Sequence, residues 1–146
     1  MAPDGPVRMT RENDVAVLRL QGRHANAIND ELMDGLMASL QEADDDPGIR
    51  GVLLCSGRKL FSPGLDLQEL VGLDRPTMDR FMERFGSCLF RLYTFPKPLV
   101  AAVTGHAVAG GCVLALTADL RLLAENAMIG LNEVQVGVPL PYGVAL

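Results

Sequence analysis

KPLVAAVTGHAVAGGCVLAL, residues 97–116, is the stretch that decides the fold. Its apolar run between Pro98 and Gly105 predicts a buried strand, and the Gly110-Gly111 pair predicts a tight turn into a buried helix. The first residues of such a helix have backbone N–H groups without helical partners, at the positive end of the helix dipole. The stretch therefore predicts a site for negative charge. The plainer alternative is that the two glycines only let a helix pack closely on a strand.

Two common phosphate-binding motifs do not fit these glycines. Gly105 and Gly110 have the spacing of a P-loop, but Gly111 and Cys112 stand where that motif has Lys and Ser or Thr. The spacing also departs from the G-x-G-x-x-G pattern of dinucleotide-binding folds. The sequence therefore argues against a nucleotide phosphate as the bound anion.

Composition narrows the class of protein. With 146 residues and 49% hydrophobic content, the chain can bury the core of one domain. The formal charge of −5, without a Lys/Arg cluster, argues against nucleic acid or an anionic membrane as partner. No apolar run reaches the roughly 20 residues that span a bilayer. Cys55, Cys88 and Cys112 lack C-x-x-C spacing, so we expect no disulfide framework, no metal site and a reducing, cytoplasmic location.

Hydrophobic periodicity predicts an alternation of strands and helices along the chain. Residues 1–6 are expected to form a disordered lead-in. The predicted elements are a hairpin of 7–9 and 15–20, a helix capped by Asn29 and stopping at 44–48, a strand at 51–55, a short helix after 61–67, a helix at 76–93, a strand at 99–104, a buried helix from Gly110, a strand at 119–124, and an extended segment or turn at 130–139.

One arrangement recurs in this order of elements. The buried strands 51–55 and 99–104 each run into a glycine-containing loop and then a helix. In a parallel sheet the C-terminal ends of the strands lie at the same edge, so the loops of Gly64 and Gly110 are expected to lie side by side. Two backbone donors could then converge on one oxygen atom.

Several separated motifs resemble the crotonase family, also called the enoyl-CoA hydratase/isomerase superfamily. They are ANAIN at 25–29, FSPGLDL at 61–67, the run from Lys97 to Asp119, and IGLNE at 129–133 with Gly137. The resemblance covers nearly all of the chain from about Val15 onward. It implies an α/β fold, a spiral of β-β-α units, in which residues 7–146 form the core without the C-terminal helical region that usually follows. It also implies a homo-oligomer, a trimer or hexamer.

The same resemblance implies a site for acyl-CoA. By motif position, the backbone N–H groups of Leu65 and Gly110 form an oxyanion hole around the thioester oxygen. Coenzyme A is then part of the substrate, and no separate cofactor is expected. The residues that line its binding site by this resemblance are Ala25, Asn26, Ala27, Phe61, Ser62, Pro63 and Gly64. Arg58 or Lys59 is either a phosphate partner or simply solvated.

The choice of reaction depends on two positions. Hydratases of the family carry two glutamates, and the matching residues here are Val113 and Glu133. One carboxylate is poorly suited to adding water but can move a proton from one carbon to another. Residues 109–119 and 129–137 are most similar to Δ3,Δ2-enoyl-CoA isomerases of fatty-acid metabolism. The sequence therefore predicts an isomerase with Glu133 as catalytic base. A non-catalytic acyl-CoA-binding or assembly module, a hydratase and a thioester hydrolase stay open as alternatives.

Other polar residues in the motifs are expected to serve the fold. His106 has no Ser or Cys partner at a recognisable spacing, which favours a structural hydrogen bond. Asp66 is expected to cap the short helix, and Asp119 to end the buried helix. Cys112 is interpreted as a small core residue, because nothing near it in the sequence marks it as a nucleophile.

Overall fold

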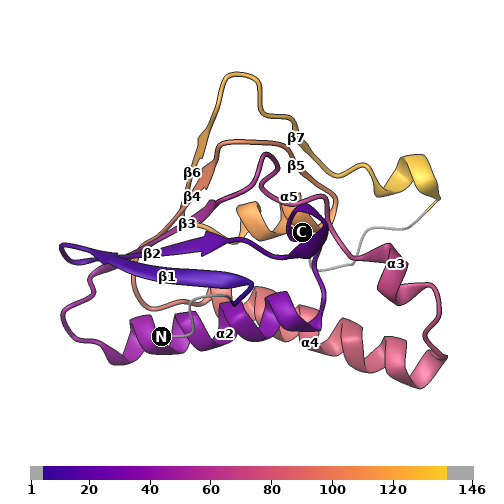
Figure 1. The fold of residues 1–146 in the computed structure, drawn as a ribbon, viewed down its shortest axis with the longest axis horizontal. Coiled ribbons are helices and arrows are strands. Elements are labelled where there is room, and N and C mark those ends of the chain that lie inside the picture. Colours follow the sequence, from indigo (N-terminus) through magenta and orange to yellow (C-terminus); the bar gives the residue numbers. More distant parts are fainter. Residues whose placement is uncertain (1–4, 138–146) are drawn as a thin grey trace.

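A five-stranded sheet carries the fold in the computed structural model, which describes residues 5–137 (Figure 1). Its strands, in spatial order, are β1 (Val7–Glu12), β2 (Val15–Leu20), β3 (Gly51–Ser56), β4 (Leu99–Val103) and β6 (Leu120–Leu123). The β1–β2 hairpin is antiparallel and the other pairs are parallel. The predicted hairpin and both predicted buried strands are confirmed, with β1 extending beyond the predicted residue 9.

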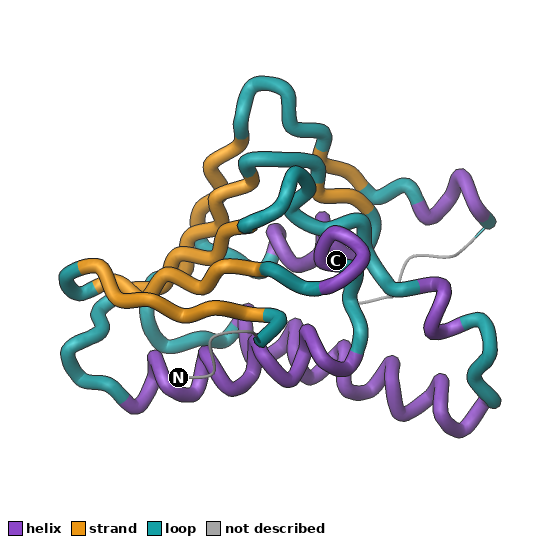
Figure 2. Tube along the Cα trace, in the orientation of Figure 1, coloured by secondary structure: helices purple, strands orange, loops and turns teal. Residues whose placement is uncertain are grey.

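Two long helices lie side by side along one face of this sheet (Figures 1 and 2). They are α2 (Asp30–Asp45) and α4 (Arg75–Tyr93), as the apolar periodicity predicts. Leu36 and Leu40 on α2 and Phe85 on α4 are buried in the core that these helices share with the strands. The helices therefore form the layer that closes this face of the sheet.

Side chains from neighbouring segments define where α2 begins and ends. The predicted cap is confirmed, because Asn29 Oδ1 accepts a hydrogen bond of 3.0 Å from the Leu32 N–H. At the other end, Lys97 Nζ donates to the carbonyls of Ala43, Asp44 and Asp46 at 2.6–3.1 Å. These carbonyls belong to the last turn, where a helix has no internal donors. Lys97 thus fixes the start of β4 against the end of α2.

A second, two-stranded sheet was not predicted from the sequence. Here β5 (Ala107–Val108) pairs in parallel with β7 (Ile129–Gly130). The sequence assigned the first of these to a loop and the second to an extended segment. Two-residue strands carry no periodicity of their own, since they exist only through their pairing. This sheet brings the segment after β7 next to the glycine loop that follows β5.

The remaining elements are short. They are α1 (Arg23–Asn26), α3 (Leu67–Leu70), α5 (Gly110–Leu116) and the 3-10 helix η1 (Glu133–Val136). Gly5 and Pro6, which the sequence assigns to the lead-in, accept hydrogen bonds from Gln21, whereas residues 1–4 and the apolar stretch 141–146 lie outside the described residues.

No helix in the described part of the chain is long and apolar enough to cross a membrane.

Candidate active site

The loop after β3 runs beside the segment that carries β5. The N–H groups of Phe61 and Ser62 donate to the His106 carbonyl at 3.0 and 3.3 Å, and the Val108 N–H donates to the Ser62 carbonyl at 3.1 Å. These bonds join two segments that follow neighbouring parallel strands. They hold the loop after β3 in a fixed position relative to the start of α5.

Glycine allows the two loops to approach this closely. A Cβ atom on Gly64, whose φ is +100°, would lie 3.0 Å from the Ala109 Cβ and 3.1 Å from the Gly110 nitrogen. A Cβ atom on Gly111 would lie 2.2 Å from the Ser62 carbonyl oxygen, which is far inside van der Waals contact. The loops of Gly64 and Gly110 therefore lie side by side, as the order of the parallel strands predicts.

The backbone N–H groups of Leu65 and Gly110, one in each loop, have no acceptor among residues 5–137. The Ile28 N–H donates to the Gly64 carbonyl at 2.7 Å and the Asp66 N–H donates to the Ile28 carbonyl at 2.9 Å, which leaves the Leu65 N–H between them unused. Gly110 is the first residue of α5, where no helical acceptor exists. Because α5 has only seven residues, the individual N–H groups matter more here than a helix dipole.

The direction of the Gly110 N–H is set by an unusual backbone conformation at Ala109. Its φ of 49° and ψ of −127° correspond to the first central position of a type II′ turn, which glycine dominates. The Ala109 N–H is held by the Gly130 carbonyl at 3.0 Å. Strained residues of this kind persist only where the surrounding structure fixes them, and they concentrate at functional sites.

Glu133 follows β7 and is the first residue of η1. Its side chain is half-buried, and its Oε2 atom is buried without a hydrogen-bond partner among the described residues. A buried carboxylate oxygen is normally paired, because leaving it unpaired is costly. Such an exception calls for a specific explanation, of which a catalytic role is one.

Glu133 lies near the first turn of α5, which contains Cys112 and Val113. Burial raises the pKa of the Cys112 thiol, the nearby Glu133 carboxylate raises it further, and a hydrogen bond with the Gly130 backbone lowers it. Glu133 is thus close enough to α5 to act on this thiol. The Val113 side chain is buried, so an apolar group occupies the position that the family resemblance matches to the second glutamate of hydratases.

The loop of residues 23–27 is held in a left-handed conformation. His24, Ala25 and Asn26 have φ values of 46°, 58° and 69°. The fully buried Asn26 amide donates to the Ser56 hydroxyl at 2.9 Å and to the Phe61 carbonyl at 3.0 Å, and also to the Leu60 carbonyl. This side chain therefore fastens the loop to the segment after β3.

Several residues expected to line the coenzyme A site are inside the protein. Asn26, Ala27, Phe61 and Ser62 are buried, with 0–5% of their surface exposed. Their side chains support the two loops from within, so any ligand on this side would meet backbone or the more exposed neighbours. Arg58 donates to the Gln21 carbonyl at 3.0 Å and lies on the surface.

The structure corrects the expected role of Asp66. Asp66 precedes α3, but its side chain makes no capping hydrogen bond. Instead, the buried carboxylate lies 2.8 Å from His24 Nδ1. No signal in the sequence pointed to this pair, because its members are 42 residues apart and neither belongs to a recognisable spacing.

Two other expectations have different outcomes. The structural role of His106 is confirmed, because its Nδ1 accepts a hydrogen bond of 2.9 Å from the Met128 N–H. Asp119 was expected to end the buried helix, but α5 ends at Leu116. Its carboxylate accepts a hydrogen bond of 2.8 Å from the Leu99 N–H at the start of β4, so Asp119 joins two strands instead.

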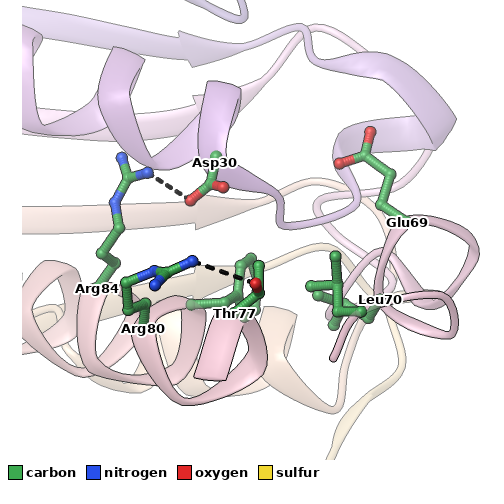
Figure 3. Close-up of a pocket in the computed structure, with 8 residues that line it drawn as sticks. Asp30, Glu69, Leu70, Thr77, Arg80 and Arg84 are labelled. Atoms are coloured by element: carbon green, nitrogen blue, oxygen red, sulfur yellow. Dashed lines mark hydrogen bonds and ion pairs between the residues drawn. The ribbon is translucent and has the colours of Figure 1, made fainter. Parts of the chain in front are cut away.

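A separate cavity of about 390 Å³ lies between α2, α3 and α4 (Figure 3). Its charged groups are already paired within the protein. Arg84 contacts Asp30 at 2.6 Å, Arg80 donates to the Thr77 hydroxyl at 3.1 Å, and Glu69 accepts from Asn29 at 3.1 Å. Within residues 5–137, no three His, Cys, Asp or Glu side chains gather as metal ligands would. The two loops and Glu133 are therefore the best candidate for an active site.

The chain matches the family model for Enoyl-CoA hydratase/isomerase over residues 10–145. It is 38% identical over 131 residues to the human enoyl-CoA delta isomerase 1, mitochondrial, covering 88% of this chain and 43% of that protein. It is 33% identical over 125 residues to a probable enoyl-CoA hydratase of Bacillus subtilis, covering 85% and 48%. The chain thus spans about half the length of the curated relatives it matches.

Solved structures agree with this relationship. A crystal structure of an enoyl-CoA hydratase/carnithine racemase from Magnetospirillum magneticum superposes with a TM-score of 0.89 at 26% identity, covering 96% of this chain and 54% of that one. An enoyl-CoA hydratase from Bacillus anthracis superposes with a TM-score of 0.86 at 26% identity, covering 91% and 53%. The crotonase fold expected from the motifs is therefore confirmed, and the chain belongs to the enoyl-CoA hydratase/isomerase family.

Proposed function

We propose that this protein is an acyl-CoA isomerase that moves the double bond of a 3-enoyl-CoA to the 2-position. In this proposal the thioester oxygen accepts hydrogen bonds from the Leu65 and Gly110 N–H groups. The Glu133 carboxylate faces the α and γ carbons of the acyl group. The substrate class follows the names of the relatives, and the choice of isomerisation follows the residues at the site.

The reaction needs one base and one anion-stabilising site. The Glu133 carboxylate removes a proton from C2, and the electrons of that C–H bond delocalise onto the thioester oxygen to give a dienolate. The two N–H groups stabilise this oxygen as its charge develops, which is where such donors lower the barrier. Glu133 then returns the proton to C4. The carbonyl re-forms, the double bond lies between C2 and C3, and Glu133 is again a carboxylate.

One observation carries the choice between isomerase and hydratase. The position that would hold a second carboxylate is the buried Val113, which leaves Glu133 as the one carboxylate proposed to face the acyl group. A single carboxylate without a fixed hydrogen bond can take and return a proton between two carbons. Hydration also requires a group that positions and activates water, which valine cannot do.

Coenzyme A is proposed to lie along the loops of residues 25–27 and 61–65. The partly buried Ala25 and Pro63, together with backbone groups, would contact the ligand. The buried Asn26 and Ser62 would hold the loops in shape, since the Ser62 hydroxyl donates to the Asn26 carbonyl at 2.8 Å. No separate cofactor is required by the chemistry.

A coupled assay with a 3-enoyl-CoA tests the proposal. Glu133→Gln should lower kcat by about 10²–10⁴-fold, because it removes the only group proposed to move the proton. Glu125→Gln is the matched control, since Glu125 is an exposed glutamate in the turn between the two sheets, and it should keep the wild-type rate. Equal rates for wild type and Glu133→Gln would overturn the catalytic assignment.

Several relatives are named as enoyl-CoA hydratases, which makes hydration the second candidate. The same proteins should therefore be tested for water addition to a 2-enoyl-CoA. We expect this rate to be far below that of isomerisation in the wild type and to rise in Val113→Glu, which restores the second carboxylate. Hydration that rivals isomerisation in the wild type would favour the hydratase. Thermal stabilisation by coenzyme A without turnover would favour a binding module.

A further inference from the structure

The carboxylate of Asp66 belongs to the residue that follows Leu65 in the chain and is nearly inaccessible to solvent. Only 3% of its side chain is exposed, and its residue is joined by a single peptide to Leu65, whose N–H is one of the two proposed donors. A buried negative charge at this place would oppose charge developing on the substrate oxygen. A partner that holds and offsets this carboxylate would therefore affect the site.

His24 supplies that partner from a different part of the chain. Its Nδ1 atom lies 2.8 Å from Asp66 Oδ2. Since a carboxylate can only accept, the bonded nitrogen carries the proton. The His24 ring is about half-exposed and sits in the left-handed loop described above, so a side chain from the loop of residues 23–27 reaches the residue that follows Leu65.

Asp66 is also the point where three connections meet. Its N–H donates to the Ile28 carbonyl at 2.9 Å, and its carbonyl accepts from the N–H groups of Glu69 and Leu70 at 3.1 Å each. The side chain of His24 makes the third connection. Asp66, the residue that follows Leu65, is thereby held from the loop of residues 23–27, from the segment before α2 and from α3.

We propose that His24 is a positioning residue for the oxyanion-binding loop. The Leu65 N–H belongs to the Gly64–Leu65 peptide, whose carbonyl accepts a hydrogen bond of 2.7 Å from the Ile28 N–H. The contact of His24 with Asp66 holds the residue on the other side of Leu65, so that both bonds together limit rotation of the donor N–H, and it offsets the buried carboxylate. This inference rests on the proposed function for its effect on catalysis. The structural part of the inference, that His24 holds Asp66 and so restrains Leu65, concerns the protein without substrate and is measurable separately.

Three variants separate positioning from mere stability. His24→Ala removes the donor. His24→Asn restores a donor at the same number of bonds from Cα as Nδ1, and asparagine tolerates the left-handed conformation found at this position. Arg91→Ala is the control, because it breaks an ion pair with Asp44 (2.6 Å) that joins the far ends of α2 and α4. That control loses this ion pair and the contact of the Arg91 guanidinium with the Phe95 ring, 5.3 Å from the ring centroid, without touching the loop.

The first measurement is amide hydrogen exchange and 15N relaxation of the free protein. In His24→Ala, exchange of the Asp66 N–H should be at least about tenfold faster, and the order parameters of Leu65 and Asp66 should fall from the rigid value of about 0.85. His24→Asn and Arg91→Ala should leave both readouts as in the wild type. Unchanged values in His24→Ala would overturn the inference, whatever the activity of the protein.

The second measurement is steady-state isomerisation by the same proteins. His24→Ala should lower kcat by about 10- to 100-fold with a smaller change in KM, because a misdirected donor loses most of its effect in the transition state. His24→Asn should recover most of kcat, and Arg91→Ala should lower thermal stability while kcat is kept. A loss of stability alone in His24→Ala would show a purely structural role. An inactive wild type with altered exchange in His24→Ala would reject the proposed function and keep the positioning role.

Discussion

Ala109 combines an unfavourable backbone conformation with a place beside the proposed oxyanion hole. An L-residue at φ 49° and ψ −127° costs of order 1–3 kcal/mol, which the bonds around it must offset. The methyl group narrows the range of conformations that the Ala109–Gly110 peptide can adopt. Compared with glycine at this position, alanine therefore lowers the free energy of unfolding but defines the direction of the Gly110 N–H more narrowly.

Ala109→Gly tests this balance. We expect the free energy of unfolding to rise by about 1 kcal/mol as strain is relieved, and kcat for a 3-enoyl-CoA to fall by about threefold to tenfold because the donor is less well directed. Urea unfolding and steady-state kinetics measure the two effects. An unchanged kcat would mean that the hydrogen bond between Ala109 and Gly130 is sufficient to orient the donor.

Cys88 makes the free energy of unfolding depend on pH in the alkaline range. Burial raises the pKa of its thiol from 9.0 to about 11; Arg84 lowers it and Asp34 raises it. Below pH 9 the thiol is neutral in both states. Between pH 9 and 11 the unfolded chain loses this proton while the folded protein keeps it, so the free energy of unfolding falls, by about 2–3 kcal/mol in all.

Cys88→Ala removes this dependence on pH and leaves Cys55 and Cys112 in place. Urea unfolding at pH 8, 9, 10 and 11 should therefore show a steeper loss of stability in the wild type than in the variant. Both proteins share every other group that titrates in this range. Parallel curves would show that the thiol ionises at the same pH in the folded and unfolded chains.

Helices α2 and α4 and the buried strands could be predicted because each has a signal of its own. Asn29 caps α2, apolar residues recur along α4 with a helical period, and β3 is a continuous apolar run. The second sheet lacked such a signal, since β5 and β7 have two residues each. Their pairing depends on contacts between residues that are 22 apart along the chain, such as Ala107 and Ile129.

Gly86 is a weak point within α4. It lies in the interior of the helix on its exposed side, and a Cβ atom there would meet nothing within 4 Å. Gly86→Ala should raise the free energy of unfolding by about 1 kcal/mol, because alanine loses less backbone entropy in a helix. Thermal unfolding measures the gain. Isomerisation should be unaffected, and a destabilised variant would show that this face of α4 is covered in solution.

The candidate site as a whole was predictable only in part. The meeting of the loops of Gly64 and Gly110 followed from parallel strands, whose C-terminal ends share one edge. The motif position of Glu133 was visible too, but its unpaired Oε2 atom was not. The internal role of Asn26 and the pairing of His24 with Asp66 depend on side-chain geometry across 30 or more residues, which no local pattern encodes.

Strand β6 forms an apolar border, meaning the edge of the five-stranded sheet with the exposed leucines that β6 carries. It is the last strand of the five-stranded sheet, and Leu120, Leu122 and Leu123 are each about half-exposed. Open strand edges with exposed apolar side chains favour pairing with another chain. We expect the protein to self-associate through this border, in line with the homo-oligomer that the family resemblance implies.

Leu122→Lys should weaken this association, because lysine at a strand edge opposes pairing. Sedimentation velocity at several protein concentrations should show a shift toward smaller species in the variant. Leu67→Lys, at an exposed leucine on α3, controls for the added charge. The same distribution of species in wild type and Leu122→Lys would place the contact elsewhere.

The contact between Gly111 and the Ser62 carbonyl limits which sequences this protein can have. Every missense codon at position 111 adds a Cβ atom that would lie 2.2 Å from that oxygen, whereas no atom of residues 5–137 lies within 4 Å of the corresponding position on Gly130. In a deep mutational scan that selects for function, all nineteen substitutions at position 111 should therefore be depleted, alanine included. Substitutions of Gly130 by the smallest side chains should be retained. A change of one methyl group at position 111 would act as a null allele, although by chemistry it is the mildest substitution available.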